Sequence, residues 1–443
     1  MNDTPRAMTD GRAAPATGRS WRSVAVLAVA LLALLTACNG GSDAGGDGPD
    51  GDGADEADVD APDADEPDTD APDGDPVTIG FLGELTGPFA VWGVPARNGM
   101  QLAVDELNAD GGIDGRPVEL VVRDTQGTPE EAVTALRGMI ERDGVVAVGG
   151  IISSDVGLAT SRVAEEQEVP LFLVKAGSDA ILTQDTRYTF RTCLPAAPMT
   201  MGPFAQFIGS EGVTRVGAII ADYAWGRAIE EAIEEQIGGP GGLDPQIEVA
   251  PVPETDFTSY LRRLEDLDPE LIIATGHPPG AAAITRQAAD LGFDAFVTGS
   301  DSSAVTIFEG VGEAAYDRYV DLSCADYAAD DYIQLATRYH DEFADFMEDD
   351  AVAGYGQVLM LRDAIEATGG TDPTAIADHL RATSFELPGY AWDLQWTEWG
   401  ELAEASPLLV VMREQTPPDG VNPGAPWYLD VILRPDPLEP FVP

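Results

Sequence analysis

From Val77 onward, short apolar runs alternate with segments whose apolar residues recur every three or four positions. A short continuous apolar run predicts a strand buried on both faces, and a three- or four-residue spacing predicts an amphipathic helix. Buried strands separated by helices form parallel sheets with helices on both faces. This alternation therefore restricts the chain to an α/β fold before any motif is considered.

The alternation comes in two series, which divide near Pro195. The first predicts strands at 78–83, 118–123, 145–150 and 170–174, with helices near 100–107, 132–140 and 156–167. The second predicts strands at 215–221, 246–252, 270–275 and 295–299, with helices at 198–210, 226–237, 258–267 and 280–291. The remainder predicts helices at 331–347, 354–369 and 373–382 and strands near 389–396 and 407–412. Because the late helices need an existing sheet to pack on, we expect the chain to cross between two lobes more than once.

The chain is strongly acidic, with 78 Asp and Glu against 24 Lys and Arg among 443 residues and a formal net charge of -54. Binding to nucleic acid through a general basic field is excluded, because it needs clustered positive charge to replace counterions. Residues 39–75 hold fifteen of the acids and no base, yet residues 76–443 still carry about -41. Dense carboxylates with a single lysine indicate a halophilic protein, since salt screens their mutual repulsion.

The N-terminal segment has the order of a secretory signal. Four arginines precede the apolar run 24–35, which ends in Leu-Thr-Ala-Cys at Cys38. Twelve apolar residues are too few to span a bilayer. The ending resembles a bacterial lipoprotein signal, which implies removal of the signal peptide 1–37 and a lipid anchor on Cys38. An ordinary signal peptide with an incidental cysteine is the alternative.

The segment 38–75 consists almost entirely of Gly, Ala, Asp, Pro and Glu. Such a composition cannot bury enough apolar area to offset chain entropy, and its like charges repel one another. We expect a disordered acidic tether between the membrane and the folded body.

The sequence lacks the motifs that usually indicate catalysis or cofactor binding. The three histidines are not at metal-ligand spacing, Lys175 is followed by alanine rather than by the Ser or Thr of a phosphate loop, and no Gly-x-Ser-x-Gly motif occurs. We predict no catalytic residue, no cofactor and no metal.

Several motifs occur in a fixed order along the chain. They are the run 79–88 (IGFLGELTGP), the run 107–113 (LNADGGI), Arg123-Asp124, Gly149-Gly150 with Ser153-Ser154, and Phe190-Arg191-Thr192. Together they resemble the leucine/isoleucine/valine-binding family of solute receptors that serve ABC importers, over nearly all of residues 77–400.

The resemblance implies a type I periplasmic binding protein fold, with two doubly wound lobes joined by a hinge of three crossing strands. Lobe 1 would comprise 76–192 and 325–387, and lobe 2 would comprise 193–324 and 388–443. The crossings would lie near 192–194, 322–325 and 387–392. A small ligand would lie between the lobes, which agrees with the rule that open α/β sheets bind ligands at the carboxyl ends of their strands.

Two loops at strand ends of the first series are candidates for holding a ligand carboxylate. Ser153 and Ser154 stand between a predicted strand and a predicted helix, where free backbone N–H groups and the helix dipole attract anions. The resemblance gives this role to Ser153; a serine that only caps the helix is the alternative. Ala176 and Ser178 match a family segment that supplies a carbonyl and a hydroxyl.

Aromatic and acidic candidates come from both series. The resemblance places Trp92 and Trp225 on opposite walls of the cleft, although core packing is an alternative for any tryptophan. His277 stands where the family often has tyrosine, and an inert loop histidine is equally compatible with the sequence. An acid that anchors a ligand ammonium in the family corresponds to Ser300 or Asp301, depending on one residue of alignment.

Lys175, the one lysine of the chain, immediately precedes the predicted ligand loop. Its ammonium could pair with a second ligand carboxylate, which would favour an acidic or amidated ligand. The alternative is a lysine that points outward and pairs with surface acids.

The resemblance places Cys193 and Cys324 on adjacent hinge strands. In an oxidising extracytoplasmic compartment we expect a disulfide between them, with two buried free thiols as the alternative.

Taken together, the sequence predicts a lipid-anchored, monomeric protein on the outer face of the cytoplasmic membrane. It would capture a small amino acid, amide or urea-like solute and deliver it to an ABC permease. A ligand-sensing module of a signalling receptor with the same fold is the alternative, and an enzyme is not expected.

Overall fold

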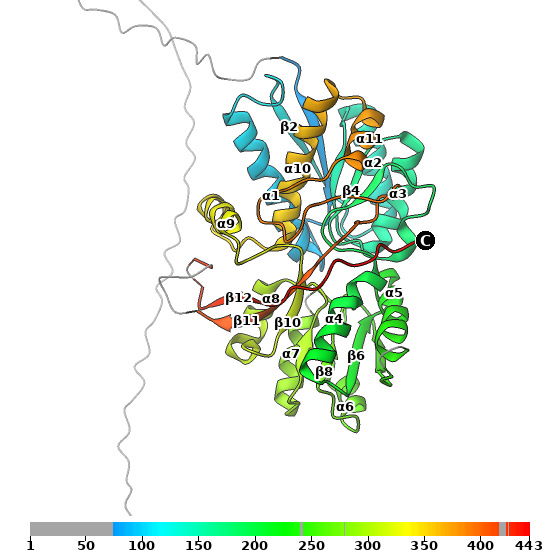
Figure 1. The fold of residues 1–443 in the computed structure, drawn as a ribbon, viewed down its shortest axis with the longest axis vertical. Coiled ribbons are helices and arrows are strands. Elements are labelled where there is room, and N and C mark those ends of the chain that lie inside the picture. The colour runs from blue at the N-terminus through cyan, green and yellow to red at the C-terminus, as the bar shows by residue number, and fades with distance from the viewer. Residues whose placement is uncertain (1–73, 240–241, 279, 416–421, 424) are drawn as a thin grey trace, which may run out of the picture. The chain divides into compact units, whose positions relative to one another are not determined.

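The computed structural model describes residues 74–239, 242–278, 280–415, 422–423 and 425–443 (Figure 1). The predicted signal peptide, Cys38 and the predicted tether up to residue 73 lie outside this part of the chain. Within the described ranges, no helix combines the length and the apolar character needed to cross a membrane.

The first lobe is built on a parallel sheet in the order β2-β1-β3-β4-β5. Its strands are β1 (Val77–Gly83), β2 (Val118–Asp124), β3 (Val148–Ile151), β4 (Leu171–Leu173) and β5 (Thr189–Arg191). Its early helices are α1 (Ala90–Ala109), α2 (Pro129–Gly138) continuing into a π-helical turn (Met139–Asp143), and α3 (Ser154–Gln167), with a 3-10 turn at Asp179–Ile181. The buried runs in β1, β3 and β4 confirm the predicted strands of the first series.

The second lobe repeats this arrangement with a parallel sheet in the order β7-β6-β8-β9. Its strands are β6 (Val216–Ala221), β7 (Gln246–Ala250), β8 (Leu271–Ile273) and β9 (Phe296–Thr298). Its helices are α4 (Ala197–Glu211), α5 (Ala224–Ile233) with a π-helical turn (Glu234–Gly238), α6 (Thr258–Leu264), α7 (Gly280–Leu291) and α8 (Ala304–Val311), followed by a 3-10 turn (Gly312–Ala315). The helix α8 was not predicted from the sequence.

A third, antiparallel sheet adjoins the second lobe. It has the order β10-β11-β12, with β10 (Val320–Ser323), β11 (Leu408–Glu414) and β12 (Trp427–Leu433). A parallel bridge between Val297 and Tyr319 connects it to the edge of the second sheet. The chain therefore returns to the second lobe at β11, after visiting the first lobe again.

The late helices are α9 (Asp330–Phe343), α10 (Asp349–Thr368) and α11 (Pro373–Ala382). The helix α10 packs closely on α1: a Cβ atom on Gly99 would stand 2.8 Å from the backbone carbon of Ala351, so only glycine allows this approach. The expectation that the late helices need an existing sheet agrees with this packing, because α1 and α10 cover one face of the first sheet (Figure 1).

The expected strand at 389–396 is wrong. Single bridges take its place, and they pair Tyr390 with Ala325, Leu394 with Phe385, and Trp396 with Leu402. The segment packs on β5: the indole Nε1 of Trp396 donates to the carbonyl of Arg191 at 2.7 Å, and the amide of Arg191 donates to the carbonyl of Gly400 at 3.1 Å. These contacts join the segment to the first lobe, and the amide of Ala391 also donates to the carbonyl of Cys324 at the second crossing at 2.8 Å. The third crossing near 387–392 and the bounds of the lobes stay predictions.

Candidate ligand site between the lobes

The two parallel sheets have the same strand order around their first strand. In each of them the first strand of the lobe is flanked by the second and third strands, and the chain leaves its carboxyl end at a topological switch point. Glu84 follows β1 and Ser153 follows β3 in the first lobe. Tyr223 follows β6 and His277 follows β8 in the second lobe.

The two switch points touch each other. The rings of Phe89 and Tyr223, one from each lobe, have centroids 5.8 Å apart. The Trp225 ring of the second lobe lies on Gly177 of the first lobe, where an added Cβ atom would stand 2.8 Å from the ring atom Cε3. We call the region between the Phe89–Tyr223 contact and the Gly177–Trp225 contact the interlobe zone.

All ten ligand-binding residues predicted from the sequence are buried. They are Trp92, Ser153, Ser154, Lys175, Ala176, Ser178, Trp225, His277, Ser300 and Asp301. They come from loops at the carboxyl ends of strands in both lobes, and from the start of α1, as a site between the lobes requires.

Ser153 and Ser154 have different partners. Ser153 stands at the N-cap position of α3, but within the described chain its hydroxyl makes no capping bond. The hydroxyl of Ser154 accepts a hydrogen bond from the amide of Ser178 at 3.1 Å, which joins the loops that follow β3 and β4. The hydroxyl of Ser153 is thus not committed to the capping role that the sequence left open.

Arg191, whose side chain is fully buried, holds the loop 176–178 in place through hydrogen bonds to its carbonyls. Its guanidinium donates to the carbonyl of Ala176 and, at 2.8 Å, to the carbonyl of Ser178. Its Nε lies 2.9 Å from Oε2 of Glu401, which is also buried. Arg191 and Glu401 therefore position the predicted ligand loop, and the Phe-Arg-Thr motif was the sequence signal that could have identified the arginine.

The aromatic candidates are anchored by their own neighbours. The indole Nε1 of Trp225 donates to the hydroxyl of Thr275 at 3.0 Å. The ring of His277 packs edge-on against Phe257 with centroids 5.1 Å apart, and burial lowers the pKa of His277. Trp92 packs beside Phe89 at 5.9 Å between centroids.

Lys175 does not point outward, so the alternative of a surface lysine is wrong. Its side chain is 4% exposed, and its Nζ pairs with Asp301 of the second lobe, with Asp349 at 3.1 Å and with Asp350 at 3.4 Å. Burial alone would lower the pKa of Lys175, but these three carboxylates outweigh it and raise the pKa well above its usual value. Asp301, rather than Ser300, is therefore the charged group of its loop that meets the first lobe.

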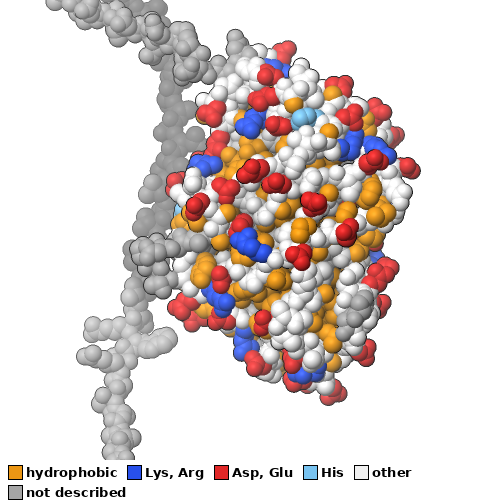
Figure 2. Space-filling model, viewed as in Figure 1, with side chains coloured by type: hydrophobic (Ala, Val, Ile, Leu, Met, Phe, Trp, Pro, Cys, Tyr) orange, Lys and Arg blue, Asp and Glu red, His pale blue; other side chains and the backbone are white. Residues whose placement is uncertain are grey.

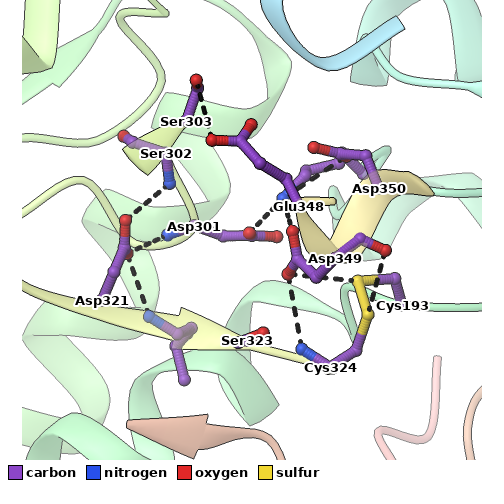
Figure 3. Close-up of polar contacts among 12 residues, drawn as sticks. Cys193, Asp301, Ser302, Ser303, Asp321, Ser323, Cys324, Glu348, Asp349 and Asp350 are labelled. Carbon is purple, nitrogen blue, oxygen red and sulfur yellow. Dashed lines mark hydrogen bonds and ion pairs between the residues drawn. A yellow bond between two sulfur atoms is a disulfide. The ribbon is translucent and has the colours of Figure 1, made fainter. Parts of the chain in front are cut away.

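Further buried acids surround this lysine, and backbone and hydroxyl groups satisfy them. Figure 3 shows Asp321 bonded to the backbone nitrogens of Asp301 and Ser302, and Glu348 directed at Ser303. The distances are 2.7 Å from Ser302 N to Oδ2 of Asp321 and 3.1 Å from the Ser303 hydroxyl to Glu348. The run Glu348-Asp349-Asp350 at the start of α10 was a missed signal, because acids favour helix N-termini.

A disulfide joins Cys193 and Cys324 in the structure, with their Cα atoms 5.3 Å apart, which agrees with the predicted pairing. Asp349 lies beside it, and its Oδ2 accepts from the amide of Cys324 at 3.4 Å. The sulfur atoms and this carboxylate lie close enough to suggest a metal site. Because the sulfurs are bonded to each other, they are not thiolates, so this group is not a metal centre.

Glu84 was quoted in a motif but not predicted as a site residue. It is fully buried, and its Oε1 accepts from the amide of Ser153 at 3.4 Å. Burial raises the pKa of Glu84 to about 7, although hydrogen bonds from the backbone and from Thr125 oppose the shift.

Two doubly wound lobes that meet at their switch points around buried polar side chains define a two-lobed α/β receptor for a small solute. The chain belongs to the periplasmic binding protein family, whose model matches residues 76–411. The predicted resemblance and fold class are thereby confirmed, and the chain is a solute-binding protein.

Named relatives agree with this family. The chain is 27% identical over 345 residues to the Leu/Ile/Val-binding protein BraC3 of Rhizobium johnstonii, covering 74% of this chain and 90% of that protein. It is 25% identical over 333 residues to the leucine-, isoleucine-, valine-, threonine-, and alanine-binding protein of Pseudomonas aeruginosa, covering 74% and 87%.

Solved structures share the fold. The branched-chain amino acid transporter substrate binding protein LivJ of Streptococcus pneumoniae, in complex with isoleucine, superposes with a TM-score of 0.69 at 22% identity, covering 76% of this chain and 96% of that one. An ABC transporter substrate-binding protein from Sphaerobacter thermophilus superposes with a TM-score of 0.72 at 24% identity, covering 82% and 99%.

Proposed function

We propose that this protein captures a small amino acid, amide or urea-like solute in the interlobe zone and delivers it to an ABC importer. The observation that supports the proposal is the contact between the lobes at the carboxyl ends of their strands, where Phe89 meets Tyr223 and Lys175 pairs with Asp301. The names of the relatives support an amino acid or a similar small solute. The protein acts by binding and closure, without chemical turnover.

The two lobes would contribute different kinds of ligand contact. Ser153, Ala176 and Ser178 offer backbone and hydroxyl groups from the first lobe. Trp225 and His277 offer ring surfaces from the second lobe, and Trp92 offers one from the first. A ligand that contacts both lobes stabilises the state in which they meet, and this differential binding is what an importer can recognise.

The N-terminal part of the chain fits this role. A lipid on Cys38 and an acidic tether would hold the folded body, as a monomer, at the outer face of the cytoplasmic membrane. Replacing Cys38 with serine should release the protein into the medium, whereas a variant that stays in the membrane fraction would contradict lipid anchoring. Labelled palmitate incorporation in the wild type is the matching direct measurement.

The ligand class is tested by thermal shift and calorimetry of the purified protein against amino acids, amides, amines, urea and short-chain acids. A binder stabilises the folded protein by mass action and so raises its melting temperature. At one hundred times its Kd, the ligand adds about 2.7 kcal/mol to the free energy of unfolding. Trp225→Ala should weaken that binder at least tenfold. Absence of any binder in the panel would refute the proposal.

A further inference from the structure

Glu84 places a protein carboxylate at the start of α3, where the sequence predicted a ligand carboxylate. The helix α3 has 14 residues, and the amide of its N-cap residue Ser153 donates to Oε1 of Glu84. The other oxygen, Oε2, makes no hydrogen bond within the part of the chain that the structure describes, although it is shielded from solvent. A buried, unpartnered carboxylate oxygen is costly unless a ligand supplies the missing donor.

The loop that begins at Glu84 borders the second lobe. Phe89, five residues after Glu84, lies 5.8 Å from the ring of Tyr223 in the second lobe, measured between ring centroids. Burial raises the pKa of Tyr223, and the charges of Asp155 and Glu84 raise it further. Asp124, at the end of β2, adds its charge to that of Glu84 on the first-lobe side. The titratable groups around Glu84 are thus Asp124 on β2, Asp155 on α3 and Tyr223 on the second lobe.

The neighbouring cations are already paired with protein acids. Lys175 pairs with Asp301, Asp349 and Asp350, and Arg191 pairs with Glu401. A ligand carboxylate placed beside Glu84 would therefore meet like charge, and Lys175 and Arg191 are already engaged by protein acids. A ligand N–H group placed there would instead supply the donor that Oε2 lacks.

We propose that Glu84 is a ligand-contacting specificity residue, whose carboxylate accepts a hydrogen bond from an N–H donor of the solute, as found in an amide, a urea or an ammonium group. The proposal rests on the proposed function, and it narrows the ligand class at the switch point of the first lobe.

The test uses solutes that share a carbon skeleton and differ in one group. Isobutyramide, isobutylamine and isobutyrate keep their charge states between pH 6 and 8, and urea and leucine complete the set. Affinities are measured by calorimetry for the wild type, for Glu84→Gln and for Glu119→Gln. The last variant makes the same chemical change at an exposed position of β2 in the same sheet.

The best binder should carry an N–H donor, and Glu84→Gln should weaken it at least tenfold while Glu119→Gln leaves it unchanged. If isobutyramide binds more tightly than isobutylamine, the group that donates to Glu84 is a neutral N–H group. If isobutylamine binds more tightly, that group is an ammonium. A carboxylate binder without an N–H group, or a best binder whose affinity Glu84→Gln leaves unchanged or increases, would overturn the inference. If no member of the set binds, the proposed function fails as well, which separates the two conclusions.

A second measurement needs no variant. The pKa of Glu84 near 7 means that its ionised form, the stronger acceptor, is lost as the pH falls below 7. The affinity for isobutyramide or urea should therefore fall from pH 8 to pH 6, approaching about tenfold per pH unit below the pKa. An affinity that is constant or rises over this range would contradict an accepting carboxylate, even if Glu84→Gln does not fold.

Discussion

Replacing Lys175 with methionine removes the one cation from a buried cluster of acids while keeping the length and apolar stem of the side chain. Three carboxylates then lose their counter-charge: Asp301 from the second lobe, and Asp349 and Asp350 from the start of α10. Removing one partner of a buried ion pair costs about 3 to 5 kcal/mol, because the remaining charge stays desolvated. With an unfolding entropy of roughly 2.1 cal/mol/K per residue and about 370 folded residues, this loss corresponds to a melting temperature lower by about 4 to 6 °C.

The loss should depend on pH, and the direction follows from the acids. Burial raises the pKa of Asp301 and of Asp350, and Lys175 opposes the shift in both. A raised carboxyl pKa gives stability that is present at low pH and lost as the pH rises through the pKa in the folded state. Without Lys175 the shift grows, so the deficit of Lys175→Met should be larger at pH 8 than at pH 5.

Calorimetric melting at these two pH values checks the reasoning, with Lys175→Arg and Arg227→Met as controls. Lys175→Arg keeps the charge and should lose less stability than the methionine variant. Arg227 is 62% exposed in an exposed pair with Asp222, so its replacement should change the melting temperature by less than about 1 °C. A Lys175→Met protein that melts within 1 °C of the wild type at pH 8, or with the same deficit at both pH values, would refute the argument.

Four further outcomes are expected. Reduction of the Cys193–Cys324 disulfide, which spans 131 residues, should destabilise the protein by about 4 to 5 kcal/mol, and mass mapping without reductant should find the two cysteines linked rather than alkylated. Glu84→Gln should raise the melting temperature at pH 8 but not at pH 4, by the equivalent of about 3 kcal/mol, because ionising Glu84 costs stability as the pH rises to about 7; equal melting at pH 8 would contradict its burial. Glu401→Leu should destabilise the protein and weaken ligand binding together, because Arg191 then loses the partner that fixes its grip on the ligand loop; unchanged stability would count against this ion pair. The melting temperature should rise between dilute buffer and molar NaCl, because about -41 charges remain on the body and acidic side chains are spread over the face seen in Figure 2; a flat dependence would argue against halophilic adaptation.

The order of elements was largely predictable, because buried strands and amphipathic helices leave strong local periodicities. The strand β1 and the helix α11 match their predicted ranges to within one residue. The strand at 389–396 was predicted wrongly, because alternating apolar residues do not show whether a neighbouring strand is available for pairing. This segment pairs with its neighbours only through single bridges.

The site was predictable where it follows from local order, because residues directly after buried strands must lie at the carboxyl edge of the sheet. Ser153 was identified in that way, whereas Asp301 came, with Ser300 as the alternative, from the resemblance to the family. The partners of Lys175 were not, since Asp349 and Asp350 are more than 170 positions away and reach it only through the packing of α10. The burial of Glu84 depends in the same way on tertiary contacts, and the motif that contains it carries no sign of its environment.

The partners of Lys175 determine which charges stay paired when the lobes rotate about the hinge. Cys324 at the hinge donates its amide to Asp349, and Asp349 in turn lies 3.1 Å from Lys175. Lys175 and Asp349 are both carried by the first lobe, so a rotation about the hinge leaves them together and moves Asp301 away with the second lobe. Lys175 then keeps two carboxylates, and Asp301 gains access to water, which removes the burial that raises its pKa. Such a rotation would therefore break the interlobe ion pair without leaving Lys175 as an uncompensated buried cation.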